Sequence, residues 1–418
     1  GRASTYVDGD GEWVEQGLHL FIGYYTELKQ LLREIQQPPD DVLFWMTQVQ
    51  MRDPDGAAAT FGINPILAPV KTLGTVLGNN DYLGALSKIG MVPLAAPGVR
   101  GYEHIRKAHD HETVYDWWKR SGASTQVLER FLRPFCRGIQ FTEPEQFSAF
   151  NFLTWIHHTA THLPTTLLGG YRGPRDVTFF QPLAAWLQAR GAKIRTGVRL
   201  VGIDHAPGTG TLGRITGFRL SDGTRLEGDA FVAALPVWAL TPLVPPALRA
   251  HPFFAGLSTL PIAPAISVQL WFDGRVTDTD DFFLVAKSEA CVFQDQSTNA
   301  YPYAGGSRLS VIVSPADPLL NVDDAAIVAR VLERLGKVEP RIQARRVLKS
   351  VVLKHTHHLV RPLPGAMSRR PTQVTPVPNL FFAGDWTEQP FFGSQEGAVR
   401  GGKRCARAIV EAFAEALV

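Results

Sequence analysis

Alternating apolar and polar residues mark several segments of the chain as β-strands with one buried face. Ile266, Val268 and Leu270 alternate with Ser267 and Gln269, which would place the three apolar side chains on one side of a strand. Comparable patterns predict further strands at Ile194, Val198, Leu200, Ile203, 218–220, 231–234, 309–313 and 380–383. The middle of the chain is therefore expected to form sheet.

Helical spacing of apolar residues dominates residues 113–161, where Trp117, Leu128, Phe131 and Leu132 recur. Residues 323–335 predict an amphipathic helix, and a helical pattern begins at 27–32. A last helix is expected from about Gly397, with a stripe of Ala398, Gly402, Cys405, Ile409 and Phe413. Near the start, 5–7 and 13–15 flank an Asp-Gly-rich turn and predict a hairpin. Strands interleaved with helices indicate an α/β protein of two domains that exchange chain.

Composition narrows the class of protein without naming a function. The 418 residues are 45% hydrophobic and 19% charged, and the net charge of +3 is too small to favour nucleic acid as a partner. Three cysteines, far apart, predict neither a disulfide framework nor a metal site, and no metal is expected. No apolar run approaches the roughly 20 residues of a bilayer span. A cytoplasmic protein is expected.

A literal GxGxxG occurs at Gly208–Gly213, but its context contradicts a dinucleotide site. Such a site needs a helix directly after the glycines, whose N-terminus receives the phosphates. Here the strand-like segment from Ile215 to Leu220 follows instead. The segment is therefore interpreted as a flexible hairpin loop.

The most informative stretch lies near the C-terminus. A buried strand ends in Gly384 and Asp385, at the edge where ligands bind to open α/β sheets. Glycine lets the backbone approach a ligand, and a carboxylate can accept from a polyol hydroxyl. The sequence Glu396-Gly397-Ala398 then begins a helix, whose N-terminus favours negative charge such as that of a reduced flavin.

This stretch resembles the flavin-contacting signature of plant- and cyanobacterial-type phytoene and ζ-carotene desaturases, in the flavin amine-oxidase superfamily. The resemblance covers 384–390 and 394–403, and the segment 10–23 resembles the stretch after the family's Gly-Gly-Arg element. It extends to 76–81, 222–230 and 269–273, and thus over nearly the whole chain.

The resemblance implies an α/β fold in which an FAD-binding Rossmann-like domain, of the glutathione-reductase and amine-oxidase type, is interleaved with an α+β substrate domain. Its implied cofactor is FAD, contacted by Arg2, Val198, Gly384, Asp385, Glu396, Gly397 and Ala398. Arg2 would lie near the pyrophosphate, and the backbone of Val198 would read the adenine. The Gly-Asp pair would hold pyrophosphate and ribitol, and the helix start the isoalloxazine ring.

The implied domain boundaries divide the chain into five segments. Residues 1–25, 171–245 and 370–418 are expected to form the FAD-binding domain, and 26–170 and 246–369 the substrate domain. Gly1-Arg2 would be the end of the Gly-Gly-Arg element. The family's strand–GxGxxG–helix unit is then expected upstream, so that the chain is an N-terminally truncated member.

Several histidines invite a chemical role. The run from Lys354 to His358 is interpreted as a surface or ring-facing strand rather than a metal site, because no cysteine or carboxylate cluster accompanies it. The family resemblance allows this segment to lie close to the flavin and to shape the pocket. His158 and His162 are i, i+4 neighbours on an expected helix, and His157-His158 replaces the Asn-Arg pair of plant phytoene desaturases. The pocket candidates are His158, Arg361, Trp386 and Phe391.

Residues 66–97 carry few charges and are rich in leucine, alanine, glycine and proline. Two interpretations stay open: a lid over a substrate tunnel, or a surface lying on a membrane with Lys71 and Lys88 at headgroup level. The second is favoured because a carotenoid has to leave a bilayer, and it predicts peripheral membrane association.

The leading hypothesis is FAD-dependent desaturation of a carotenoid precursor such as phytoene, with electrons passed to a quinone-like acceptor. One alternative is a flavin-dependent amine oxidase or an oxidoreductase of another isoprenoid. A second alternative is a truncated, non-catalytic homologue. No nucleophile elbow and no HExxH motif support hydrolase chemistry.

Overall fold

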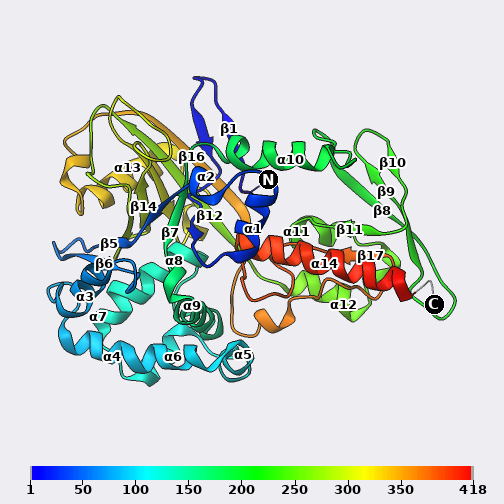
Figure 1. Ribbon diagram of the computed structural model, residues 1–418, viewed down its shortest axis with the longest axis horizontal. Coiled ribbons are helices and arrows are strands. Elements are labelled where there is room, and N and C mark those ends of the chain that lie inside the picture. The colour runs from blue at the N-terminus through cyan, green and yellow to red at the C-terminus, as the bar shows by residue number, and fades with distance from the viewer. Residues whose placement is uncertain (1, 416–418) are drawn as a thin grey trace. The chain divides into compact units, whose positions relative to one another are not determined.

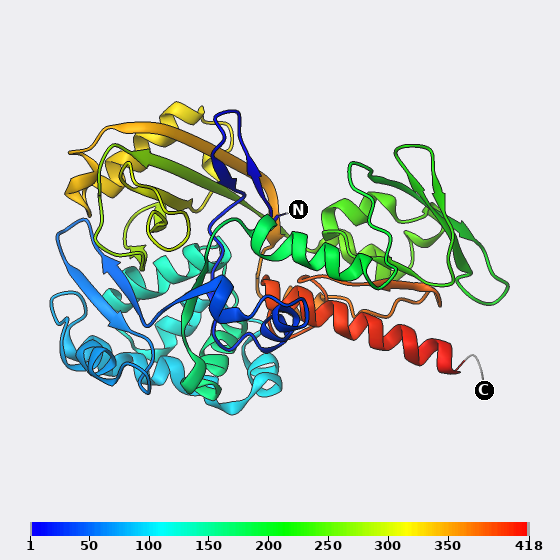
Figure 2. The same cartoon turned by 45° about the horizontal axis from the view of Figure 1, so that its top comes forward.

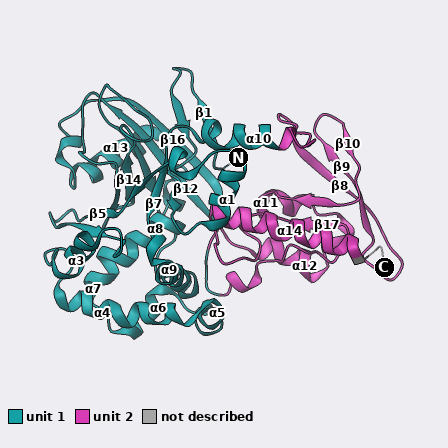
Figure 3. Cartoon of the chain, in the orientation of Figure 1, with its two compact units in different colours: residues 1–186, 263–358, 362–364 teal, residues 187–262, 359–361, 365–418 magenta. Residues whose placement is uncertain are grey.

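The computed structural model describes residues 2–415 and divides the chain into two compact units (Figure 3). Unit 1 comprises Gly1–Trp186, Ala263–His358 and Pro362–Pro364, and unit 2 comprises Leu187–Ile262, Leu359–Arg361 and Gly365–Val418. The expected exchange of chain between two parts is thus present. Residues 2–25 and 171–186, which the family resemblance predicts in the FAD-binding part, lie in unit 1. The functional assignment of each part stays a prediction.

A seven-stranded sheet organises unit 1 (Figure 1). In spatial order its strands are β16 Val347–Val360, β12 Ile262–Phe272, β15 Arg308–Val313, β14 Ala290–Asp295, β13 Phe282–Val285, β5 Gln48–Arg52 and β6 Ala58–Gly62. Neighbours whose register is resolved run antiparallel, apart from the parallel pair β13 and β5. Helix α13, Asp324–Gly336, packs Ile327, Val331 and Leu335 into the same core as β12 and β15.

The prediction of one buried face for β12 was wrong, because both of its faces are buried. Val268 and Leu270 enter the core as expected. On the other face Gln269 is also buried, and its amide donates to the backbone oxygen of Glu15, 2.6 Å away. The segment of the chain around Glu15 covers this face of the sheet, and Gln269 pairs with it. Alternation of apolar and polar residues does not show whether the polar face meets solvent or another segment of the chain.

Helices form a layer beside this sheet, as the two views of Figures 1 and 2 agree. They are α3 Pro69–Leu77, α4 Ala85–Ala95, α5 Tyr102–His109, α6 Val114–Ser121, α7 Thr125–Val127, α8 Arg133–Gln140 and α9 Ala149–Thr161. The helical prediction for 113–161 is confirmed. Helix α8 approaches β14 closely, because a Cβ on Gly138 would lie 2.3 Å from a methyl of Val292.

The N-terminal residues form the predicted hairpin, β1 Thr5–Val7 with β2 Trp13–Glu15. Helices α1 Thr26–Glu34 and α2 Pro39–Val42 follow, and a second small sheet has the order β3 Phe21–Ile22, β7 Leu168–Tyr171, β4 Leu43–Met46. The hairpin is anchored by Arg175, which is 1% exposed. Its guanidinium donates to the oxygens of Ala3 (2.6 Å) and Gly17 (3.4 Å) and lies 3.3 Å from the Glu15 carboxylate.

Unit 2 contains two small sheets. One is the meander β8 Leu200–Ala206, β9 Arg214–Leu220, β10 Arg225–Leu226, and the other is the parallel pair β11 Phe231–Ala233 and β17 Leu380–Phe382. Helices α11 Val237–Leu240, α12 Pro252–Ala255 and α14 Gln395–Glu415 belong to this unit, and α10 Gln181–Gln188 crosses the boundary between the units. The GxGxxG segment is the loop between β8 and β9, which confirms it as a hairpin loop.

The prediction of a strand that includes Ile194 and Val198 was wrong. Residues 192–199 form no helix or strand, and Ile194 is 40% exposed. An apolar alternation becomes a strand only when a neighbouring strand pairs with it, and none of the described residues pairs with this segment as a ladder.

We expect Arg175→Met to destabilise unit 1 by about 3 kcal/mol or more, because it leaves the Glu15 carboxylate buried without its ionic partner. Urea unfolding of the full chain measures this change. Lys337→Met is the matched control, because Lys337 pairs with Glu333 on the surface, where an ion pair contributes about 1 kcal/mol or less. Equal effects of the two substitutions would contradict the anchoring role.

Candidate cofactor site

The C-terminal strand, loop and helix form the unit that the sequence indicated. Strand β17 lies beside β11 and delivers Gly384 at its carboxyl end. Gly384 has φ +137°, a conformation that side chains disfavour, and a Cβ there would lie 2.8 Å from the indole nitrogen of Trp386. The backbone after β17 is therefore shaped in a way that requires glycine.

The loop after β17 is held by partners that the sequence analysis did not identify. Arg370 is buried and donates to the oxygens of Thr387 (3.0 Å) and Gln389 (2.9 Å). Gln373 donates to the Thr387 hydroxyl at 3.0 Å. These residues stand in no motif, and their role depends on a loop that folds back toward them. The conformation of the Gly-Asp loop is thus fixed from within unit 2.

Trp386 and Phe391, both expected pocket residues, are buried. The indole N–H of Trp386 donates to the oxygen of Leu235 at 2.9 Å, and its ring lies 5.7 Å from that of Phe382. The guanidinium of Arg400 lies 4.4 Å from the ring centroid of Phe391. Trp386 already uses its one polar atom, so it can offer only apolar ring surface to a ligand. Their place in a pocket stays a prediction.

Helix α14 begins at Gln395, two residues before the expected start. Ser394 caps it: the Gly397 N–H donates to the Ser394 hydroxyl (3.0 Å) and the Ala398 N–H to the Ser394 oxygen (3.0 Å). The amides of Gly397 and Ala398, expected at the flavin ring, therefore have partners within the chain. A Cβ on Gly397 would lie 2.1 Å from the oxygen of Phe391, so this glycine is needed for packing.

Helix α14 lies against the loop after β17 because Gly401 has no side chain. A Cβ at Gly401 would lie 2.7 Å from the backbone oxygen of Gly384 and 3.0 Å from the hydroxyl of Thr387. Gly402, the next residue, has open space around it. The sequence pattern grouped Gly402 with the buried stripe, but the close approach belongs to Gly401.

The two acidic candidates are both buried. Asp385 is 8% exposed, and Glu396 is fully buried and pairs with Arg400 one turn later, at 2.7 Å. The Glu396 carboxylate thus has a strong partner within α14, which meets the requirement that a buried charge be paired. Contact of either carboxylate with FAD stays a prediction.

A second group of candidate residues lies in unit 1. The Arg2 guanidinium donates to the backbone oxygen of His358 at 2.6 Å. His19 bonds the oxygen of Gly17 (2.6 Å), and burial together with the charge of Arg175 lowers the pKa of His19 well below its usual range. Burial, with Arg2 and His355 beside it, lowers the pKa of His358 to about 3. Both imidazoles are neutral at pH 7, in a group that carries the fixed positive charges of Arg2 and Arg175.

The remaining predicted site residues are distributed as follows. Val198 lies in the irregular segment before β8 and is partly exposed. Arg361 lies in unit 2 just after β16, and its backbone N–H donates to the oxygen of Pro261. His158 is buried on α9, its ring 5.9 Å from that of Tyr24. One loop and the helix after it thus carry most of the predicted residues: Gly384, Asp385, Trp386, Phe391 and 396–398. The other predicted residues lie on separate elements.

The histidine strand carries no sign of a metal site. Lys354–His358 lies within β16 as predicted, and the His355 ring bonds the oxygen of Gln16 at 2.7 Å. Across residues 2–415, no three histidine, cysteine, aspartate or glutamate side chains are placed to share a metal ion.

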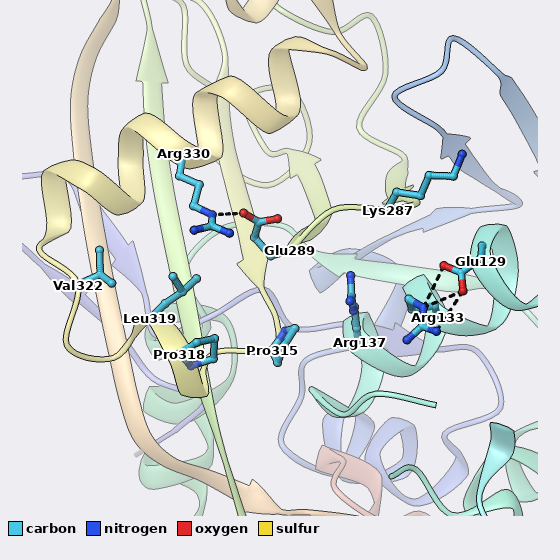
Figure 4. Close-up of a pocket in the computed structure, with 10 residues that line it drawn as sticks. All are labelled: Glu129, Arg133, Arg137, Lys287, Glu289, Pro315, Pro318, Leu319, Val322 and Arg330. Carbon is cyan, nitrogen blue, oxygen red and sulfur yellow. Dashed lines mark hydrogen bonds and ion pairs between the residues drawn. The ribbon is translucent and has the colours of Figure 1, made fainter. Parts of the chain in front are cut away.

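A cleft of about 540 Å³ in unit 1 has none of these candidates among the residues that line it (Figure 4). Arg137, Lys287 and Arg330 line it, together with prolines at 315 and 318. All four of its cations already have partners: Arg330 pairs with Glu289, Arg133 and Arg137 with Glu143, and Lys287 with Asp53 and Asp55. The cleft therefore offers no clear excess of charge to a ligand.

The chain matches the family model described as flavin containing amine oxidoreductase over residues 1–410. It belongs to this family. It is an FAD-dependent oxidoreductase, and the fold of interleaved FAD-binding and substrate parts expected from the sequence is confirmed.

Among curated proteins the chain is similar to carotenoid desaturases. It is 28% identical to 15-cis-phytoene desaturase of Synechococcus elongatus, over 98% of this chain and 88% of that protein. The tomato (Solanum lycopersicum) enzyme of that name is also 28% identical, over 99% and 72%. A probable zeta-carotene desaturase of S. elongatus is 28% identical over 99% and 92%. The resemblance to this group is confirmed; the expected truncation is not confirmed by these alignments.

Solved structures support the fold. An oxidoreductase from Methanosarcina mazei superposes with a TM-score of 0.71 at 16% identity, covering 98% of this chain and 91% of that one. A putrescine oxidase bound to putrescine gives the same TM-score, identity and coverage. At this level of identity the likeness concerns the fold alone.

The residues present fit a flavin cofactor. Gly401 lets helix α14 approach the loop after β17 closely, and a Cβ on either Gly384 or Gly401 would collide with neighbouring atoms. In unit 1 the charge of Arg175 is already paired with Glu15, and the expected contact of Arg2 with the pyrophosphate stays a prediction.

We expect Gly401→Ala to raise the FAD dissociation constant about tenfold, because the new methyl displaces the backbone of Gly384 from its position. Flavin fluorescence titration measures this. Gly402→Ala is the control: its methyl enters open space, so FAD affinity should stay unchanged while the helix gains about 0.5–1 kcal/mol. Loss of affinity in both variants would contradict the role of the close approach.

Proposed function

We propose that the protein desaturates a long acyclic polyene of the phytoene class. The supporting observation is that the similarity to phytoene and ζ-carotene desaturases extends over 98–99% of this chain. A match confined to the cofactor motif would support only flavin binding. The likeness to amine oxidases is one of fold at 16% identity, so it does not favour an amine as substrate.

The bound flavin supplies the hydride acceptor, which is chemistry that amino-acid side chains lack. The chain's own task is to orient a substrate that has no polar atoms, and to exclude water from it. Trp386 and Phe391 are the candidate rings for this task, because both are apolar and Trp386 already uses its one polar atom. His158 and Arg361 are the further pocket candidates. Arg370 and Ser394 hold the loop and the helix start that carry these rings.

We propose a quinone-like molecule as the electron acceptor. The GxGxxG segment forms a hairpin loop, so this segment offers no helix N-terminus to a nicotinamide dinucleotide. An apolar quinone would share the solubility of the polyene and reach the protein through the same bilayer.

We further propose that the helices around residues 66–99 contact a membrane surface. Ten large apolar side chains of this segment are exposed: Ile66, Leu67, Val70, Leu73, Val76, Leu77, Leu86, Ile89, Val92 and Val99. Val70 is 82% and Leu86 85% exposed. Single exposed apolar side chains are ordinary on a protein surface, whereas ten within one segment of the chain are not. No helix among the described residues is long and apolar enough to cross a bilayer. The exposure favours surface contact over a lid buried in the core.

Of the two lysines expected at headgroup level, Lys88 has another role. Its amine donates to the backbone oxygens of Val76 and Gly78 and to the side chain of Asn80, so it caps the C-terminal end of α3. Lys71 is exposed and stays a candidate for contact with lipid headgroups.

Phytoene supplied in liposomes with a quinone tests the substrate class. We expect bound flavin to become reduced, and absorbance of the lengthened conjugated polyene to increase with time. Release of hydrogen peroxide on addition of an amine would favour the amine-oxidase alternative. A chain that binds no flavin under these conditions would favour the non-catalytic alternative.

We expect the double variant Val70→Asp, Leu86→Asp to bind phosphatidylcholine vesicles at least tenfold more weakly than the wild type, because two charges would enter the apolar contact. Vesicle co-sedimentation measures this. The control is Val410→Asp, Phe413→Asp, which changes two exposed apolar residues on α14 instead. Unchanged vesicle binding by the first variant would remove this surface from consideration.

A further inference from the structure

A smaller cleft, of about 300 Å³, lies within unit 1 where two parallel strands begin, and is called the β5–β13 cleft below. Asp280 and Asp281, which line it, directly precede β13, and Gln48 is the first residue of β5. Because the two strands run parallel, with Phe282 opposite Val49, these starts lie side by side. The volume is at the lower end of the range for small-molecule sites, so the cleft suits a small polar group.

The two carboxylates of the β5–β13 cleft are buried and lack a cationic partner. Asp280 is 7% and Asp281 6% exposed. One oxygen of Asp280 accepts two hydrogen bonds from Asn299, of 2.7 and 2.9 Å. One oxygen of Asp281 accepts from the amides of Gln48 (2.7 Å) and Gln50 (2.9 Å), and its other oxygen accepts no hydrogen bond from the described residues. Neither carboxylate belongs to an ion pair among those residues, although a buried charge needs such a partner.

Two cations line the same cleft, and no acidic side chain of the described residues pairs with them. The Lys71 amine donates to the hydroxyl of Thr47 at 3.2 Å, and Nε of Arg172 donates to the backbone oxygen of Leu43 at 3.1 Å. Both side chains are exposed, and their remaining N–H groups can bind a phosphate. The cleft therefore offers buried acidic groups to a cation and exposed basic groups to an anion.

Lys71 connects the cleft to the exposed apolar side chains of α3. Val70, directly before it, is 82% exposed, and Leu73, two residues after it, is 58% exposed. The helix is held in this place because β6 ends in Gly62, where a Cβ would lie 2.5 Å from the backbone of Lys71. A ligand whose anionic part binds Lys71 would have apolar side chains beside the rest of it. A phospholipid meets this condition, because its phosphate is joined to acyl chains.

The aromatic side chains of the cleft do not favour a trimethylammonium group. Such a group binds to the faces of several rings. The ring of Phe44 packs against Gly170, where a Cβ would lie 2.4 Å from it, and the ring of Trp45 packs against Gly169, where the distance would be 3.0 Å. Because both rings are used within the protein, the carboxylates remain as the partners of a cation. Carboxylates favour an ammonium that carries N–H donors.

We infer that the β5–β13 cleft binds the headgroup of a phospholipid with a primary ammonium, of the phosphatidylethanolamine type. Asp280 and Asp281 accept from the ammonium, and Lys71 and Arg172 donate to the phosphate. The inference rests on the proposed contact of residues 66–99 with a membrane, and adds a lipid preference to it. A headgroup bound beside Lys71 would hold α3 against the bilayer.

Vesicle co-sedimentation of the full chain tests this preference with two compositions, phosphatidylcholine alone and phosphatidylcholine mixed with phosphatidylethanolamine. We expect the wild type to bind the mixed vesicles about tenfold more tightly, because only the primary ammonium can donate to the carboxylates. Asp281→Asn keeps the size of the side chain and removes its charge, so it should bind the two compositions with equal affinity. Its Tm should stay equal or rise, because a buried charge without an ionic partner is removed.

Two further variants separate the cleft from other sources of a preference. Asp278→Asn is the matched control, because it makes the same change three residues earlier, at an exposed side chain that pairs with Arg341. This variant should keep the preference for mixed vesicles. Lys71→Gln should weaken binding to both compositions alike, because both lipids carry the phosphate. A loss confined to mixed vesicles in Lys71→Gln would contradict the assignment of Lys71 to the phosphate.

The outcomes that overturn the inference differ from those that overturn the proposed membrane contact. Equal binding of both compositions by the wild type overturns the inference and leaves the membrane contact intact. A preference that persists in Asp281→Asn overturns it as well, because the preference would then come from the packing of the bilayer. Vesicle binding that is absent in the wild type defeats the inference together with the membrane contact.

Phosphoethanolamine in solution separates a lipid from a soluble ligand of the same chemistry. If it raises the Tm of the wild type and not that of Asp281→Asn, while the vesicles show no preference, the cleft takes a soluble ligand and the lipid is overturned as its occupant. A rise in Tm together with a preference for mixed vesicles supports the headgroup.

Discussion

The buried pair of Glu15 and Arg175 connects the start of the chain to the body of unit 1. Arg175 reaches the backbone at Ala3 and Gly17 as well as the carboxylate of Glu15, so one guanidinium fixes both strands of the N-terminal hairpin. Its position settles where Arg2 and His19 lie, and therefore which groups can face a cofactor. Replacing Arg175 would leave the Glu15 carboxylate in a medium that solvates it poorly, so the hairpin depends on this residue.

Glycine performs the corresponding task in unit 2. Gly397 and Gly401, within the stretch that resembles the flavin-contacting signature, are required by the protein's own packing. The first makes room for the oxygen of Phe391 and the second for that of Gly384. Close passage of α14 against the loop is what gives the Gly-Asp turn a defined shape before any ligand arrives. The motif therefore fixes the backbone conformation of the loop and of the helix start, and this conformation determines which atoms can contact a ligand.

The polar contacts around Arg175 in unit 1 and those around the loop and helix α14 in unit 2 leave apolar side chains of the molecule free for a hydrocarbon substrate. Polar atoms near the candidate site are paired with one another, as Trp386 is with Leu235 and Glu396 with Arg400. The exposed apolar side chains of α3 and α4 lie elsewhere in unit 1, on a layer of helices with few charges. A protein that binds an apolar substrate and a polar cofactor has to separate these two kinds of surface.

Local periodicity was enough to predict the hairpin, the helices of 113–161, the strand–loop–helix near the C-terminus and the decoy glycine loop, since each depends on neighbours in sequence. The family resemblance supplied the cofactor and the fold. Tertiary structure alone decided that Gln269 is buried and that Ile194 to Val198 forms no strand. It also revealed Arg175, Arg370 and the state of His358. These features depend on partners more than a hundred residues away or on a loop that folds back, and pairing across such distances leaves no periodic trace in the sequence.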